Sequence, residues 1–370
     1  MRLLILLLAV ATTAAQSQAH FQVSHSTESL RGVSAVSRKI AWASGTRGTY
    51  LRTTNEGQDW VPSKVPGAGS LDFRGVVAFS ADEAFLMASG QGEQSRIYHT
   101  TDAGQHWTLQ FTNHNPKGFF DSIAFWDEKH GVVLGDPVPD ENGKLKFEIL
   151  LTDDGQTWHE LSPSLLPDAI EGEGAFAASN TCIAILKRGL QKQHSDRGSQ
   201  AQRPKSSAPA ALDSNIWFAT GGKAARVFHS PDDGKTWEVF ESPIVHGIES
   251  AGIFSITFRD PLHGVIAGGD YKRAHDDGPN LAFTEDGGKT WRLSEAKPQA
   301  YFSAAAYARG TDRDRLIVVA QDFILELRRS ANPQRIGGKA AQGFSFNTVS
   351  PYPEGGALVV GAKGVIASLP

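Results

Sequence analysis

The chain has 370 residues, of which 40% are apolar, and a formal net charge of −4 from 36 Lys and Arg residues and 40 Asp and Glu residues. This balance, without a visible basic stripe, lacks the usual signature of a nucleic-acid-binding protein, so no nucleic acid is expected as a partner. The single cysteine, Cys182, excludes an intramolecular disulfide framework. The length fits either two ordinary domains or one large repeat architecture.

The first predicted element is a secretory signal peptide over residues 1–19. Met1 and Arg2 supply a positive start, residues 3–11 are apolar, and small residues follow at two candidate cleavage sites. The apolar run is shorter than the roughly 20 residues that a membrane-spanning helix needs, and no later segment reaches that length. We therefore expect residues 20–370 to form a protein without a membrane span, periplasmic or secreted.

Short β-strands are predicted next, beginning with residues 21–26. Residues 32–37, 40–44 and 49–53 follow, with alternating small, β-branched and aromatic side chains that favour strands over helices. The same series of three strands recurs before the next tryptophan. Each series leads into a turn that ends in a tryptophan.

Five segments of the chain share one turn pattern, S/T-x-D-x-G-x-x-W, with Asn55 at the Asp position of the first copy and Leu151 at the Ser/Thr position of the third. This pattern is the Asp-box: its Asp or Asn accepts hydrogen bonds from the amides of a tight turn, its Gly adopts positive φ, and its Trp packs the hairpin onto the sheet. We predict a structural role for these three positions in all five copies. They are Asn55, Gly57, Trp60, Asp102, Gly104, Trp107, Asp153, Gly155, Trp158, Asp232, Gly234, Trp237, Asp286, Gly288 and Trp291.

The tryptophan spacing predicts a repeat of one supersecondary unit. A four-stranded propeller blade needs about 40–50 residues, so each interval between tryptophans corresponds to one blade. The longest interval contains residues 189–213, a polar stretch rich in Ser, Gln and Pro, which predicts a disordered surface insertion. Two units without the turn pattern follow Trp291, beginning near Phe302 and Phe344. The total is seven.

We therefore predict an all-β fold: a seven-bladed β-propeller of four-stranded antiparallel blades, in one domain over residues 20–370. The last unit has only three strands, the third at 365–368, whereas the strand at 21–26 has no blade of its own. Closing the ring removes the open edges of the sheets. We expect the N-terminal strand to close the propeller by completing the last blade.

Three segments carry a resemblance to a known family: Ile40–Gly45, Phe73–Val76 and Phe283–Trp291. They resemble Asp-box propellers with bacterial neuraminidase repeats, the superfamily of the sialidases. Within it they look most like the photosystem II assembly and stability factors of cyanobacteria and plastids and their relatives in non-photosynthetic bacteria. The resemblance covers nearly the whole mature chain and implies an extracytoplasmic binding scaffold, although one fold serves many functions.

The mouth of the channel on the upper face, where the first strand of each blade begins, is the predicted binding site. Aligning the first strands on their ends places charged residues there in four consecutive blades and phenylalanines in the next three. In chain order the seven are Arg31, Arg74, Asp121, Glu173, Phe254, Phe302 and Phe344. Ion pairs that hold neighbouring blades in register are the alternative role for the four charged residues.

Two long loops, between the second and third strands of blades three and five, project onto the same face. They bring Asp136, Asp270 and Tyr271 toward the mouth, and Glu171 is expected to join them. Asp136 and Asp270 each follow a glycine at a strand end, where capping of a turn is the alternative role.

The predicted function is that of a monomeric binding scaffold that recognises a protein segment or a glycan at its upper face. No zinc, phosphate-loop or dinucleotide motif appears, so neither a cofactor nor a metal ion is expected. The alternative is a carbohydrate-active enzyme, a glycoside hydrolase or sialidase-like protein that uses mouth carboxylates. The two mouth arginines fall short of the three that a sialidase needs for its substrate carboxylate.

Overall fold

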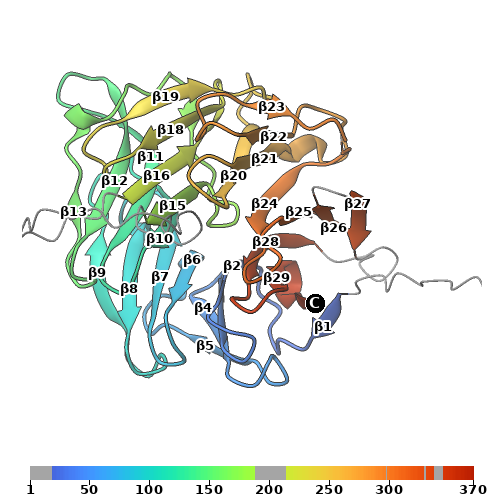
Figure 1. The fold of residues 1–370 in the computed structure, drawn as a ribbon. Helices are drawn as coiled ribbons and strands as arrows, with labels where there is room; N and C mark the ends of the chain where they lie inside the picture. Colours follow the sequence, from blue (N-terminus) through green and yellow to red (C-terminus); the bar gives the residue numbers. More distant parts are fainter. Residues whose placement is uncertain (1–18, 188–213, 297, 329–330, 337–344) are drawn as a thin grey trace, which may run out of the picture.

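Seven four-stranded antiparallel blades surround a central channel in the computed structural model, in the arrangement of a β-propeller (Figure 1). The structure describes residues 19–187, 214–296, 298–328, 331–336 and 345–370. This architecture confirms the predicted fold class. The predicted insertion at 189–213, and all of the predicted signal peptide except Ala19, lie outside the described residues.

Each of the first three blades runs from an inner strand beside the channel to an outer strand at the rim. Blade one contains β2 (Leu30–Ala35), β3 (Ala41–Gly45), β4 (Thr49–Thr53) and β5 (Val61–Lys64). Blade two contains β6 (Asp72–Ala78), β7 (Ala84–Ser89), β8 (Arg96–Thr100) and β9 (Thr108–Thr112). Blade three contains β10 (Phe120–Phe125), β11 (Gly131–Pro139), β12 (Leu145–Thr152) and β13 (His159–Glu160).

Blades four to six follow the same order from the channel outward. Blade four contains β15 (Ile183–Lys187), β16 (Ser214–Ala219), β18 (Arg226–Ser230) and β19 (Glu238–Glu241). Blade five contains β20 (Ala251–Phe258), β21 (Gly264–Asp270), β22 (Leu281–Thr284) and β23 (Arg292–Leu293), and two short strands, β14 (Glu173–Gly174) and β17 (Gly221–Gly222), extend its sheet beyond β20. Blade six contains β24 (Phe302–Tyr307), β25 (Arg315–Ala320), β26 (Ile324–Arg328) and β27 (Ala331–Ile336).

The last blade is closed by the N-terminal strand, as the sequence predicts. Its strands are β28 (Phe346–Pro351), β29 (Ala357–Gly361), β30 (Ile366–Leu369) and β1 (His20–Gln22). Phe21 of β1 lies opposite Ala367 of β30. Single 3₁₀ turns occur at Gly92–Gln94, Pro163–Leu165, Tyr271–Arg273 and Ala362–Gly364, and no described helix is long and apolar enough to cross a membrane.

The hydrophobic core lies between the blades. Each of seven apolar clusters in the described part of the chain combines buried side chains of two neighbouring blades. Between blades one and two, for example, Trp42 of β3 packs with Phe73 of β6 and Leu86 of β7. Since both faces of a blade are buried in this way, middle strands such as β7 are nearly continuous apolar runs.

The repeated turns lie between the third and fourth strands, on the lower face. In the second copy, Thr100 Oγ1 donates to Asp102 Oδ1 at 2.9 Å and accepts from the amide of Gly104 at 3.0 Å. Asp102 Oδ1 also accepts from the amide of His106 at 2.9 Å. Ala103 and Gly104 both adopt positive φ, at 64° and 85°. The first, fourth and fifth copies contain the same two bonds. The glycine amide donates to the Ser or Thr hydroxyl, and the amide of the residue before the tryptophan donates to the side-chain oxygen of the Asn or Asp.

The third copy is shorter by one residue, and here the sequence assignment of Asp153 is wrong. The hydroxyl that accepts from the amide of Gly155 belongs to Thr152, because Leu151 occupies the position where the other copies have Ser or Thr. Asp154 therefore accepts from the amides of Gln156 and Thr157, both at 2.7 Å.

Candidate functional site

β-Bulges bring one residue of nearly every inner strand into the channel mouth. In six of the seven inner strands, the pairing with the second strand shifts register once near the upper end. The residue at such a shift has no partner in the ladder, and the bulge re-aims its side chain. The six residues are Arg31, Arg74, Asp121, Phe254, Ser303 and Asn347. Only β15 of blade four pairs without a shift.

Gly, Ala or Ser follows five of these bulged residues, and Thr348 follows the sixth. Small side chains are needed there because neighbouring blades approach closely. A Cβ on Gly32 would lie 3.1 Å from the carbonyl oxygen of Arg74 in the next blade. On Gly75 it would lie 2.7 Å from Cγ2 of Ile123, again in the next blade. The order large apolar residue, bulged residue, small residue is therefore a local signature of the mouth.

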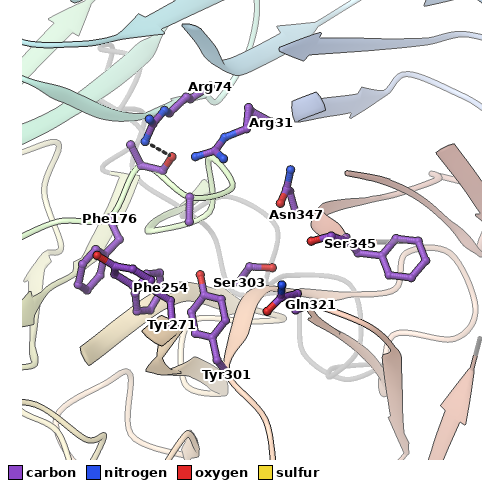
Figure 2. Close-up of a pocket in the computed structure, with 13 residues that line it drawn as sticks. Arg31, Arg74, Phe176, Phe254, Tyr271, Tyr301, Ser303, Gln321, Ser345 and Asn347 are labelled. Carbon is purple, nitrogen blue, oxygen red and sulfur yellow. Dashed lines mark hydrogen bonds between the residues drawn. The ribbon is translucent and has the colours of Figure 1, made fainter. Parts of the chain in front are cut away.

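A pocket of about 490 Å³ opens between five of the six bulged residues on the upper face (Figure 2). This volume lies within the range of small-ligand and peptide side-chain pockets. Arg31 and Arg74 form one side, and Phe176, Phe254, Tyr271 and Tyr301 form the other. The polar side chains that complete the lining are Ser303, Gln321, Ser345 and Asn347. No carboxylate lines this pocket in the described part of the chain.

The two guanidinium groups differ in their partners. Arg74 Nε donates to Asp72 Oδ2 at 2.8 Å, and its Nη1 donates to the carbonyl oxygen of Ala177 at 3.2 Å. Arg31 has no acceptor among the described residues, and its Nε is buried without a hydrogen bond. Burial, and then the neighbouring charge of Arg74, lower the pKa of Arg31. The cationic side of the pocket therefore has unused hydrogen-bonding capacity for an anionic group.

The aromatic side is centred on Phe254. Its ring is stacked on Phe176, with centroids 3.8 Å apart and an interplanar angle of 5°. Tyr301 meets it edge-on at 4.7 Å, and Tyr271, of which 47% is exposed, does so at 6.2 Å. Burial raises the pKa of Tyr301, so the phenol stays protonated and can donate a hydrogen bond.

The floor of the pocket is a segment that crosses the channel, residues 175–181, which we call the crossing segment. It occupies the place where an upper extension of β15 would otherwise lie. On one side, the Asn180 side chain pairs with the backbone of Ile123, accepting from its amide at 2.7 Å and donating to its carbonyl at 3.1 Å.

On the far side, the crossing segment is tied to blades six and seven. Ser179 Oγ donates to the carbonyl oxygen of Ser303 at 2.6 Å, and Thr348 Oγ1 donates to the carbonyl oxygen of Ser179 at 2.7 Å. These contacts fix Phe176 and Ala177 under the pocket from several blades at once.

Asp121 and Asp136, which the sequence predicted in the pocket, lie behind the crossing segment instead. Asp121 is a bulged residue at the upper end of its inner strand, but the segment covers it: only 1% of it is exposed, and the amide of Ala177 acts on its carboxyl group. Asp136 Oδ1 accepts from the amide of Ala175 at 2.9 Å. Both groups therefore contact the floor of the pocket and do not line the pocket itself.

Glu173 is wrongly placed by the sequence alignment, because residues 173–179 are not an inner strand. Its carboxylate is buried and accepts from Arg226 Nε at 3.0 Å, with a second contact of 2.5 Å to Arg226 Nη2. Thr220 Oγ1 donates to the same carboxylate at 2.6 Å. Glu173 therefore forms a buried ion pair between blades, which was the alternative role.

Of the other loop residues predicted at the mouth, one lines the pocket and two do not. Tyr271 lines the pocket as predicted, whereas Asp270 caps the turn Tyr271–Arg273 by accepting from the amide of Lys272 at 3.0 Å. Glu171 is exposed and does not line the pocket.

Sequence analysis placed four of the lining residues at the mouth and missed the others, which are Phe176, Ala177, Ala178, Tyr301, Ser303, Gln321, Ser345, Phe346 and Asn347. Phe302, which it placed at the mouth, is fully buried in the core, and Phe344 lies outside the described residues. The bulge signature marks the correct positions, Ser303 after Phe302 and Asn347 after Phe346. No local signal marks Phe176.

No model of a known protein family matches the sequence. The chain is similar to the chloroplast photosystem II stability/assembly factor HCF136 of Arabidopsis thaliana, with 24% identity over 300 residues that cover 76% of this chain and 70% of the relative. It is 26% identical to the photosystem II assembly protein Ycf48 of a Synechococcus species over 232 residues, 58% of this chain and 62% of that protein. A solved structure described as YCF48 bound to D1 peptide aligns with a TM-score of 0.63 and 14% identity, over 97% of this chain and 98% of that one. At this identity the structural likeness establishes the propeller fold.

Proposed function

We propose that this chain is a scaffold, similar to the photosystem II assembly factors, that binds a segment of another protein in its upper pocket. The observation that carries the proposal is the guanidinium group of Arg31, which faces the pocket without an acceptor in the described part of the chain. An acidic side chain or a C-terminal carboxylate would bind between Arg31 and Arg74. An apolar residue beside it would pack against Phe254 and Tyr301.

The comparisons support a protein ligand. Two relatives are named for photosystem II assembly, and the aligned YCF48 structure contains a D1 peptide. A glycoside hydrolase would need a pair of carboxyl groups facing its substrate. Asp121 and Asp136, the two carboxyl groups that contact the crossing segment, do not line the pocket.

We also propose that residues 1–19 direct export and that the five lower turns are structural Asp-boxes. Cell fractionation of the chain with a C-terminal epitope tests export. Mass spectrometry of the periplasmic or secreted protein is expected to find that it begins close to residue 20. A cytoplasmic protein of full length would contradict the proposal.

Titration of a defined peptide tests the binding site. The probe is fluorescein-labelled Ala-Ser-Gly-Phe-Glu with a free carboxylate, and its control carries Gln and a C-terminal amide. Arg31→Ala is expected to weaken binding of the acidic probe by about tenfold or more, since a charge-assisted hydrogen bond contributes about 1.5–3 kcal/mol. Arg292→Ala, which removes an exposed arginine from an outer strand, is the matched control. Equal affinity of Arg31→Ala and the wild type would contradict the site.

A further inference from the structure

Three carboxyl groups of blade three gather behind the crossing segment. Asp121 follows Phe120 on β10, Asp136 follows Gly135 on β11, and Glu148 lies on β12. Gly135 is opposite Phe120 on one side and Glu148 on the other, so the three groups occupy neighbouring positions at the upper end of one sheet. Burial raises the pKa of Asp121 well above its usual range, and the charges of Asp136 and Glu148 raise it further.

Two of these groups hold the floor of the pocket directly. Asp136 Oδ1 accepts from the amide of Ala175 at 2.9 Å. The amide of Ala177 faces Asp121 and lowers its pKa, and Asp121 Oδ2 is buried without a hydrogen-bond partner among the described residues. Ala177 in turn accepts from Arg74 through its carbonyl oxygen. These contacts thus connect the carboxyl groups to the cationic side of the pocket through a single short segment.

The cluster has little positive charge of its own. No Lys or Arg among the described residues forms a salt bridge with Asp121, Asp136 or Glu148. The Arg74 charge acts on Asp121, whereas Asn113 Nδ2 donates to Glu148 Oε2 at 3.0 Å. The other titratable groups around the cluster are Cys182, Glu160, Lys117, Glu249 and Glu173, the last already paired with Arg226.

We propose that Asp136 and Glu148 are a proton-controlled regulator of the upper pocket, so that its affinity for an acidic segment rises as they become protonated. When both are ionised, their negative charge offsets the positive charge of Arg31 and Arg74 across a poorly solvated region. The positive potential in the pocket is then lower, and an acidic ligand is attracted less strongly. When both are neutral, the two guanidinium groups act on the ligand without that opposition. This inference rests on the proposed function.

The pH range follows from the environment of the two groups. Burial is the largest cause in both cases, and it raises the pKa of Asp136 to about 6 and that of Glu148 to about 7. Both carboxyl groups therefore change charge between about pH 8 and about pH 5.5, whereas an exposed Glu of the ligand stays ionised over that range. Affinity for the ligand should increase as the pH falls.

The test measures the same Phe-Glu probe at about pH 8 and about pH 5.5. We expect wild-type affinity to be about three- to tenfold higher at the lower pH, which corresponds to one or two charges acting through a partly screened interior. The variant Asp136→Asn/Glu148→Gln keeps both shapes and the acceptor for Ala175. It is expected to bind equally at both values, as tightly as the wild type at low pH. A wild type without pH dependence, or a double variant that retains it, would overturn the regulator.

A second readout does not need a ligand. Ala178→His places an imidazole in the lining of the pocket, on the crossing segment, and NMR follows its titration. Adding Asp136→Asn/Glu148→Gln is expected to lower the pKa of this imidazole by about half a unit or more, because two negative charges are lost nearby. An unchanged imidazole pKa would overturn the regulator even if no peptide binds, whereas a shifted pKa without peptide binding would count against the proposed function alone.

Discussion

Each lower turn of the propeller is stabilised by hydrogen bonds within a few residues, whereas the upper pocket is lined by residues from segments spread between Arg31 and Asn347. In a lower turn, one hydroxyl and one carboxylate satisfy the amides of the next few residues, as Thr100 and Asp102 do. The pocket instead depends on bulges and on a crossing segment that contacts blades on both sides of the channel. The lower face is repeated and structural, and the upper face is unique and open to function.

The largest effect is expected at the buried ion pair beneath the upper face. Arg226→Ala leaves the carboxylate of Glu173 buried without its partner, and loss of one partner of such a pair costs about 3–5 kcal/mol. Urea denaturation measures the loss. The control is Glu173→Gln/Arg226→Met, which buries no net charge and should destabilise the fold less than the single variant. A loss below about 1 kcal/mol for Arg226→Ala would contradict the assignment of Glu173 and Arg226 as a buried pair that stabilises the fold.

The two regions should respond oppositely to pH. Asp136 and Glu148 have a raised pKa in the folded chain, so their stabilisation is complete below about pH 4 and is lost as the pH rises through about 6 and about 7. Hydrogen bonds from His106 lower the pKa of Asp102 to about 2, so its stabilisation is present above about pH 4 and is lost as the pH falls through about 2.

We therefore expect unfolding free energy to fall between about pH 5 and pH 8, by no more than about 3 kcal/mol for each upper carboxyl group. Urea midpoints across this range measure the change. Asp136→Asn/Glu148→Gln should flatten the decrease, and an unchanged slope in that variant would assign the decrease to other groups.

A smaller effect is expected in a lower turn. Thr100→Val removes the acceptor for the amide of Gly104 and the donor to Asp102, which costs about 1–2 kcal/mol. Because the turn lies at the other end of blade two from the pocket, the folded protein should bind the Phe-Glu probe as the wild type does. Thermal unfolding and peptide titration of the same sample check both parts. A weakened affinity would show that the two faces are coupled through the blade.

The same contrast explains what the sequence could predict. The lower turns recur as short patterns, so their spacing predicts the length of a blade and, with the two units after Trp291, the blade count. The closure was predicted from the missing fourth strand of the last unit, and the strand that closes it is His20–Gln22. Arg31 and Arg74 were placed correctly because their strands share a common length. The third turn was misassigned at Asp153 because its loop is one residue shorter, which only the position of Thr152 reveals.

The upper face could be predicted less well because its floor is not part of the repeat. Residues 175–179 are mostly apolar, as the inner strands are, so their sequence resembles a strand although they cross the channel. This resemblance put Glu173 in the mouth and hid Phe176. The coverage of Asp121 also depends on contacts with distant blades, which no local pattern records.

The most direct test compares Arg31→Ala/Arg74→Ala with Thr100→Val in one experiment that measures both peptide affinity and unfolding free energy. The account predicts that the double arginine variant loses binding of the Phe-Glu probe while most of its stability remains. Arg31 has no hydrogen-bond acceptor among the described residues to lose, and Arg74 loses only its bonds to Asp72 and Ala177. Thr100→Val should lose stability and keep its affinity. Full binding by the double arginine variant would contradict the assignment of the upper pocket as the binding site.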